Sequence, residues 1–158
     1  MVRININEEE VILAKQMRDK LDAVKKYDKI KCANNYIGIL GEIVLDRYLK
    51  EQSIPHTWVQ FLKEDKGWNE PDFIYDGKTI DLKTTRGEEM WFQNPKHDIY
   101  IHARIEEGDT TLEVDGLTTR GIMNRMIVDG RADVVKRGSR SDYVVSPMKM
   151  IPITFLWR

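Results

Sequence analysis

The dipeptide Asp76-Gly77 lies between two short alternating segments and predicts a β-hairpin over residues 72–84. Both central residues of a type I′ turn need positive φ, which Gly adopts freely and Asp tolerates. A two-residue loop also fixes how the two strands pair. Asp72 is therefore predicted to lie opposite Asp81.

The predicted hairpin has two unlike faces, because side chains alternate along a strand. One face is apolar and holds Phe73, Tyr75, Ile80 and Leu82. Asp72, Asp81 and Lys83 share the other face, where opposed carboxylates about 5 Å apart repel each other. A divalent cation would reverse that repulsion, since Mg²⁺ binds one or two carboxylates together with waters and phosphate oxygens. The alternative is a solvated face on which Asp81 pairs with Lys83 or another lysine.

A third carboxylate, Glu42, lies in a segment that is apolar nearly all round. Residues 34–52 have helical periodicity and predict a largely buried helix. A buried charge without a partner is costly, so Glu42 needs a compensating group. Gly38 and Gly41 each cost about 1 kcal/mol in a helix interior, which indicates close approach of another segment. Alternatively, Glu42 lies at the wet edge of the helix or pairs with Arg47.

The order of elements predicts an α+β fold in a single domain spanning residues 1–158. Helices are expected at 8–27, 34–52 and, more briefly, 118–130; strands are expected at 56–62, 72–84 (as the hairpin), 98–106, 111–117, 142–147 and 150–157. The sheet is expected to be mostly antiparallel. In the strand at 98–106, isoleucines face one way and Tyr100, His102 and Arg104 the other.

Composition narrows the class of protein further. Net charge is −1 and the pI about 6.3, which does not by itself indicate a nucleic-acid binder, although segments 15–31 and 118–140 are rich in lysine and arginine. The single cysteine, Cys32, excludes an internal disulfide and a cysteine-rich zinc site. No apolar run approaches the ~18 residues of a membrane span. The N-terminal residues lack a signal-peptide core, so a cytoplasmic protein is expected.

The motifs "GE" in an apolar helix, then "PD", then "IDLK" resemble those of the PD-(D/E)xK nuclease superfamily, which has the restriction-endonuclease-like fold. The resemblance covers residues 30 to 85. It implies a mixed central sheet flanked by helices. It also implies a divalent-metal site formed by Asp72, Asp81, Glu42 and the backbone carbonyl of Leu82, with Lys83 as the catalytic lysine. The expected cofactor is Mg²⁺, with Mn²⁺ as a substitute.

These features predict a metal-dependent phosphodiesterase in which Lys83, Glu42, Asp72 and Asp81 are catalytic and DNA is the expected substrate of endonucleolytic cleavage. A metal ion held by carboxylates activates water and stabilises charge on phosphate. RNA as substrate and exonucleolytic cleavage stay open. The alternatives are a non-cleaving nucleic-acid-binding or interaction module on the same fold, and a structural protein with a charged edge hairpin. Cutting two strands with one site per chain favours a homodimer.

Overall fold

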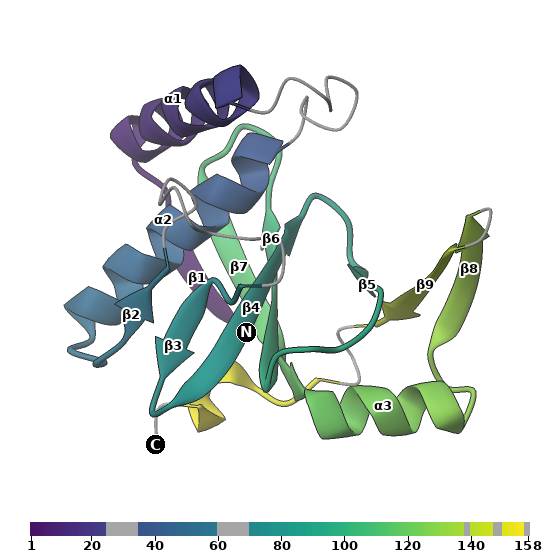
Figure 1. Ribbon diagram of the computed structural model, residues 1–158. Helices are drawn as coiled ribbons and strands as arrows, with labels where there is room; N and C mark the ends of the chain where they lie inside the picture. Colours follow the sequence, from purple (N-terminus) through teal and green to yellow (C-terminus); the bar gives the residue numbers. More distant parts are fainter. Residues whose placement is uncertain (25–34, 60–69, 138–139, 147–149, 157–158) are drawn as a thin grey trace.

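The computed structural model describes residues 1–24, 35–59, 70–137, 140–146 and 150–156, and its main feature is a mixed six-stranded sheet (Figure 1). In spatial order the strands are β1 (Val2–Asn5), β7 (Thr111–Thr119), β6 (Ile99–Ile105), β4 (Lys78–Thr85), β3 (Phe73–Tyr75) and β2 (Thr57–Trp58). Neighbours in this sheet are antiparallel, apart from the parallel pair β4–β6. The mostly antiparallel sheet was predicted.

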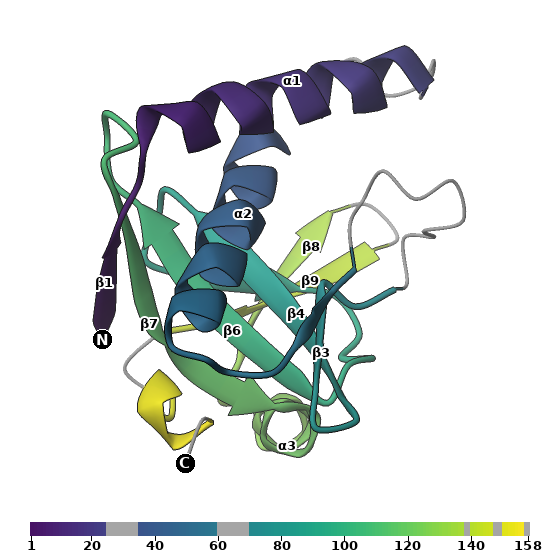
Figure 2. The same cartoon turned by 90° about the vertical axis from the view of Figure 1, so that its left-hand side faces the viewer.

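A second, three-stranded sheet and three α-helices complete the described fold. The small sheet has the order β5 (Met90–Phe92), β9 (Arg140–Val145) and β8 (Asp133–Arg137). The helices are α1 (Glu8–Val24), α2 (Asn35–Glu51) and α3 (Arg120–Val128), followed by the 3₁₀ helix η3 (Ile153–Phe155). Figure 2 shows α2 lying across one face of the large sheet, with β8 and β9 behind it. The class is therefore α+β, as predicted.

Two apolar cores lie on opposite faces of β6, because its side chains alternate. Ile99 and Ile101 pack in the core beneath α2, whereas Tyr100 belongs to a second core. The larger core joins α2 to β4 through residues such as Leu40, Val44, Ile80 and Leu82. The smaller one is formed by Met90, Phe92, Met123, Met126, Ala132 and Val145. Alternation along 98–106 is confirmed.

The hairpin has the register expected from its turn. Phe73 pairs with Ile80, and Tyr75 pairs with Lys78. Asp76 and Gly77 have φ values of 47° and 70°, the left-handed conformations that a type I′ turn requires. The helices at 8–27 and 34–52 are likewise confirmed as α1 and α2, with residues 25–34 outside the described part.

The C-terminal strand predicted at 150–157 is wrong. Only Ile151 bridges to the sheet, opposite Leu117, and the chain then turns into η3. Pro152 explains the break, since proline has no N–H to donate to a strand neighbour. The short strands β1, β5 and β8 were not predicted. In the strand predicted at 56–62, β2 covers Thr57–Trp58, and residues 60–62 lie outside the described residues.

No helix among the described residues has the length and apolar character needed to cross a membrane.

Gly41 sets how closely α2 approaches β4. A Cβ at this position would overlap the Thr84 hydroxyl and lie 2.9 Å from Thr84 Cβ, whereas a Cβ at Gly38 would meet nothing within 4 Å. Of the two glycines predicted to mark a close approach, only Gly41 does so.

Gly41→Ala is expected to lower the free energy of unfolding by about 1–3 kcal/mol, because the added methyl overpacks a close contact. Gly38→Ala is the matched control. It should raise stability by up to about 1 kcal/mol, the usual advantage of Ala over Gly in a helix. Urea unfolding of both variants measures the difference. Equal changes in the two would contradict a special role for Gly41.

Candidate functional site

Asp72 lies just before β3, and its carboxylate is bound to the backbone of β4. Its N–H donates at 2.9 Å to the carbonyl of Ile80, the residue that pairs with Phe73, so Asp72 and Phe73 both lie opposite Ile80. The regular ladder ends at Phe73, and the predicted pairing of Asp72 with Asp81 is not formed. Asp72 Oδ2 accepts a hydrogen bond from the N–H of Leu82 at 2.7 Å. The carboxylate is buried. Asp72 is thus held where β4 continues past the end of β3.

The backbone of Leu82 on β4 faces the carboxylate of Asp72. In a strand, the N–H and C=O of one residue point towards the same neighbour. Since the N–H of Leu82 points to Asp72, its carbonyl points to that side as well. The resemblance assigned this carbonyl as a metal ligand, and its direction is compatible with that role.

Asp81 and Lys83 form an ion pair on one face of β4, with Asp81 Oδ2 2.6 Å from Lys83 Nζ. Asp81 is buried, and the Lys83 side chain is 35% exposed. Burial disfavours the ammonium, but the attraction of Asp81, supported by Asp72 and Tyr100, more than offsets it and raises the pKa of Lys83. Lys83 therefore carries its charge at neutral pH.

The expected repulsion between Asp72 and Asp81 is relieved within the chain. Asp72 accepts the N–H of Leu82, and the ammonium of Lys83 neutralises Asp81. This is the pairing considered as the alternative to a metal ion. A cation that binds Asp81 would have to displace this lysine.

Glu42 is buried on α2, with 7% of its surface exposed. Its Oε2 accepts a hydrogen bond from Trp58 Nε1 at 2.9 Å. Trp58 pairs with Phe73, the neighbour of Asp72, so Glu42 reaches the start of β3 through one side chain. Arg47, the alternative partner, instead binds Glu10 at 2.7 Å and Glu51 at 2.9 Å.

The three carboxylates do not form a preassembled metal cage. Among the described residues, no three His, Cys, Asp or Glu side chains come close enough to hold a metal ion together. Such a cage is not required for Mg²⁺, which binds through one or two carboxylates and keeps several waters. Asp72 and Asp81 both act on the charge of Lys83. Carboxylate and carbonyl oxygens are the ligand types that a small hard cation prefers.

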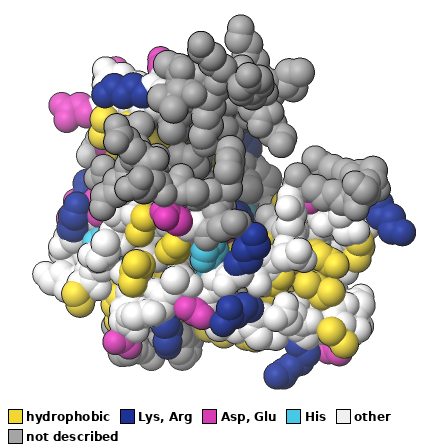
Figure 3. Space-filling view, in the orientation of Figure 1, with side chains coloured by type: hydrophobic (Ala, Val, Ile, Leu, Met, Phe, Trp, Pro, Cys, Tyr) yellow, Lys and Arg dark blue, Asp and Glu magenta, His cyan; other side chains and the backbone are white. Residues whose placement is uncertain are grey.

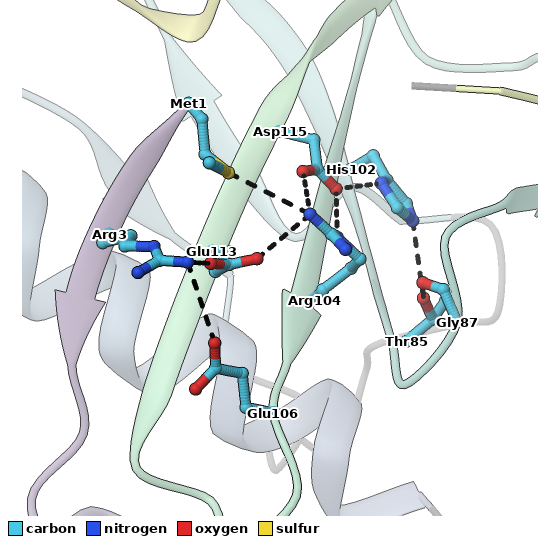
Figure 4. Close-up of polar contacts among 9 residues, drawn as sticks. All are labelled: Met1, Arg3, Thr85, Gly87, His102, Arg104, Glu106, Glu113 and Asp115. Carbon is cyan, nitrogen blue, oxygen red and sulfur yellow. Dashed lines mark hydrogen bonds and ion pairs between the residues drawn. The ribbon is translucent and has the colours of Figure 1, made fainter. Parts of the chain in front are cut away.

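A buried histidine on the same sheet face was not predicted as part of the site. His102 on β6 is fully buried, and its Nδ1 donates to Asp115 Oδ2 at 2.8 Å, since a carboxylate can only accept (Figure 4). Its Nε2 lies 3.4 Å from Thr85 Oγ1, and this hydroxyl donates to the carbonyl of Gly87 at 2.7 Å. His102 thus supports β4 two residues beyond Lys83.

Charged side chains continue this network across the sheet towards β1 (Figure 4). Arg104 binds both oxygens of Asp115 at 2.9 Å and Glu113 at 3.0 Å, and Arg3 pairs with Glu113 from the other side. The alternation of Tyr100, His102 and Arg104 was visible in the sequence. Their partners were not, because pairing of β6 with β4 and β7 joins distant segments.

The ionised form of Asp115 is stabilised in the folded protein. Burial raises the pKa of its carboxyl, but hydrogen bonds from His102 and Arg104 outweigh this and lower the pKa below its usual value. A depressed pKa means that this stabilisation is present above the unfolded pKa of about 3.9 and is lost as the pH falls through the lower, folded value.

Asp115→Asn is expected to destabilise the protein at neutral pH, with the deficit shrinking as the pH falls below about 4. Asp129→Asn removes a carboxylate from an exposed ion pair with Arg131 and serves as control. It should change stability by less than about 1 kcal/mol. Thermal unfolding between pH 3 and 7, values chosen around the aspartate pKa, compares the two. A deficit of Asp115→Asn that is independent of pH would contradict the role assigned to its charge.

The described residues of the two basic segments make separate contacts, and Arg120 of the second segment reaches the hairpin through Asp98, which accepts hydrogen bonds from Thr79. Lys15 and Arg18 lie over the ring of Tyr36, at 5.4 and 5.9 Å from its centroid. Arg120 pairs with Asp98 at 3.2 Å. Figure 3 shows basic and acidic side chains interspersed over the middle of one face, and hydrophobic ones gathered beside them. Their part in binding nucleic acid stays a prediction.

The fold and the hairpin define an α+β protein with a buried acidic site that carries one lysine. Comparison with known protein families, with curated proteins and with solved structures finds no match to this chain.

Proposed function

We propose that this chain is a divalent-metal-dependent nuclease with a restriction-endonuclease-like core, and that it cuts DNA within the strand. The observation that carries the proposal is the hairpin site, where the Asp72 carboxylate binds the backbone of β4 at Leu82, next to Asp81, and Lys83 follows on the face of Asp81. The order of α2, β3 and β4, and the packing of α2 on the mixed sheet, are what this core requires.

Each site residue would have a role that follows from its chemistry. Asp72, Asp81 and the carbonyl of Leu82 would hold Mg²⁺ or Mn²⁺, with Glu42 supporting them from α2. The bound ion would supply an activated water and stabilise charge on the phosphate. Lys83, with its raised pKa, stays cationic. Once it leaves Asp81, it can neutralise charge that develops on the phosphate oxygens.

Burial gives these charges their effect. Asp72, Asp81 and Glu42 are each less than one-tenth exposed, and charges interact more strongly where water is excluded. In the absence of a cation, the ammonium of Lys83 neutralises Asp81. A bound metal ion would therefore replace the positive charge of Lys83 beside Asp81. The positive charge, from either source, lowers the free-energy cost of keeping the aspartates buried.

Incubation with supercoiled plasmid tests the proposal. We expect relaxed and linear DNA with Mg²⁺ or Mn²⁺ and unchanged plasmid with EDTA. Intact plasmid under all three conditions would contradict the proposed activity. Linear product would require two cuts, and sedimentation of the chain would then test the predicted homodimer.

A non-cleaving binding module is the second candidate, and one observation favours it. Lys83 already neutralises Asp81, and no three-ligand cluster stands ready in the described residues. This candidate predicts that the protein shifts DNA in a gel to the same extent with Mg²⁺ and with EDTA. It also predicts that no cleavage product forms.

A further inference from the structure

A cavity opens next to the site, just beyond Lys83 on β4. It has a volume of about 340 Å³. The cavity is lined by Thr85, Gly87, Glu88, Glu89 and Trp91. Small-molecule sites span roughly 300–1,000 Å³, so this cavity has room for one flat ring system and its substituents but not for paired bases.

The cavity lies further along the strand that carries the proposed catalytic residue Lys83. Lys83 and Thr85 lie on the same face of β4, about 6.6–6.8 Å apart along the strand at ~3.3–3.4 Å per residue. The Thr85 hydroxyl donates to the carbonyl of Gly87 and lies 3.4 Å from Nε2 of His102. A nucleotide whose phosphate lies at Lys83 therefore has its sugar and base within reach of the cavity.

One wall of the cavity offers an aromatic surface. Trp91 is the central residue of β5, and its neighbours Met90 and Phe92 are buried in the smaller core. Because side chains alternate along a strand, the indole of Trp91 projects from the opposite face, where it is 36% exposed. Nucleobases stack on such side chains regardless of their sequence.

The lining also carries two carboxylates, and this charge selects what can enter. Glu88 and Glu89 are exposed and accept hydrogen bonds but donate none when ionised. They repel a phosphate group, so the cavity is unsuited to the backbone of a nucleic acid. They attract the N–H groups of a base, as in the known contact of Glu or Asp with the amino group of cytosine.

We propose that this cavity binds one unpaired nucleobase with an exocyclic amino group, guanine above the others, next to the phosphate held at Lys83. The inference rests on the proposed function, because it names the substrate feature read beside the same site. Guanine presents N1–H and N2–H₂ side by side and can give two hydrogen bonds to one carboxylate. Thymine turns two carbonyl oxygens towards the same wall and is disfavoured.

A base can enter only when it is out of its stack, so the cavity selects single-stranded or locally unpaired nucleic acid. Enzymes that read a base in a pocket use its Watson–Crick edge together with aromatic stacking. Trp91 and the two glutamates supply these two kinds of contact. The substrate of the proposed nuclease is accordingly a strand with an unpaired guanine beside the cleaved bond.

Binding of fluorescent single-stranded oligonucleotides in EDTA tests this inference without any cleavage. One oligonucleotide is all thymine, and the other has a single central guanine. Wild type should bind the guanine oligonucleotide more tightly, and this preference should vanish when the guanine is paired in a duplex. Trp91→Ala should weaken guanine binding roughly 5- to 150-fold, the loss of one base stack. Val128→Ala, which removes an exposed apolar side chain from α3, should not.

The double variant Glu88→Gln with Glu89→Gln separates a base from a phosphate in the cavity. A base site predicts that the guanine preference falls while binding of the all-thymine oligonucleotide stays equal or becomes tighter. A phosphate site predicts that both oligonucleotides gain to the same extent, which would overturn the inference. Equal affinity of wild type for the two oligonucleotides, no binding of either, or guanine binding that is unchanged by Trp91→Ala would also overturn it. A guanine preference without plasmid cleavage would uphold the cavity and contradict the nuclease.

Discussion

Lys83→Ala is expected to slow metal-dependent cleavage by about 10²–10⁴-fold, the usual contribution of a side chain that assists proton transfer or charge development. The reason is the position of its ammonium, which lies 2.6 Å from Asp81 and stays charged at neutral pH because its pKa is raised. An ammonium has no lone pair to give to a metal ion. The variant should therefore cleave DNA more slowly and still hold the metal ion through the same ligands.

The same variant should bind Mn²⁺ at least as tightly as wild type does, and more tightly if the ion has to displace Lys83 from Asp81. Calorimetric titration measures this affinity separately from cleavage. Lys78→Ala is the matched control, because it removes an exposed lysine from the start of the same strand. Cleavage at the wild-type rate would remove Lys83 from the mechanism, and weaker metal binding would make its ion pair with Asp81 a structural contact only.

Asp81→Asn is expected to abolish cleavage and to weaken metal binding by more than about tenfold. Loss of a residue that merely supports a metal ligand costs about 10- to 100-fold in affinity, and loss of the ligand itself should cost no less. Stability without metal should change little, since the Lys83 side chain is 35% exposed and can turn to water. Asp76→Asn is the matched control, because Asn also tolerates the positive φ of the turn.

Thermal unfolding with and without Mn²⁺ reports the binding directly. An ion present at about 100 times its Kd stabilises the folded state by ~2.7 kcal/mol. Wild type and Asp76→Asn should show this stabilisation in full, and Asp81→Asn should lose most of it. An equal shift in all three would place the metal elsewhere in the chain.

The hairpin could be predicted because its signals are local. Asp76 and Gly77 specify the turn, and the turn specifies that Tyr75 pairs with Lys78 and Phe73 with Ile80. The pairing does not extend to Asp72, whose N–H binds the carbonyl of Ile80 instead. The burial of Glu42 followed in the same way from the apolar residues around it. These inferences need no knowledge of how distant segments meet.

The partners of these residues could not be predicted, because they come from distant parts of the chain. His102 meets Thr85 only because β6 pairs in parallel with β4, and Asp115 meets His102 through the pairing with β7. Gly41 could be recognised as a close approach, but Thr84 could not be named as the side chain that it meets. Parallel pairing depends on packing across many residues and leaves no short motif.

The pairing of the small sheet could not be predicted from the sequence either. β5 has only three residues, and its pairing with β9 crosses some fifty positions of sequence. Trp91 could not be placed at a cavity from the sequence, since its exposure depends on this pairing and on burial of its two neighbours. The cavity that extends the candidate site is therefore a property of the folded chain.

Cleavage of supercoiled plasmid by wild type, Asp81→Asn and Asp76→Asn, with Mg²⁺ and with EDTA, tests the central claim most directly. The account predicts relaxed and linear products from wild type and Asp76→Asn with Mg²⁺, none from Asp81→Asn, and none from any protein with EDTA. Cleavage by Asp81→Asn at the wild-type rate, or an undamaged plasmid after incubation of wild type with Mg²⁺, would contradict the assignment of the hairpin as a metal-dependent nuclease site.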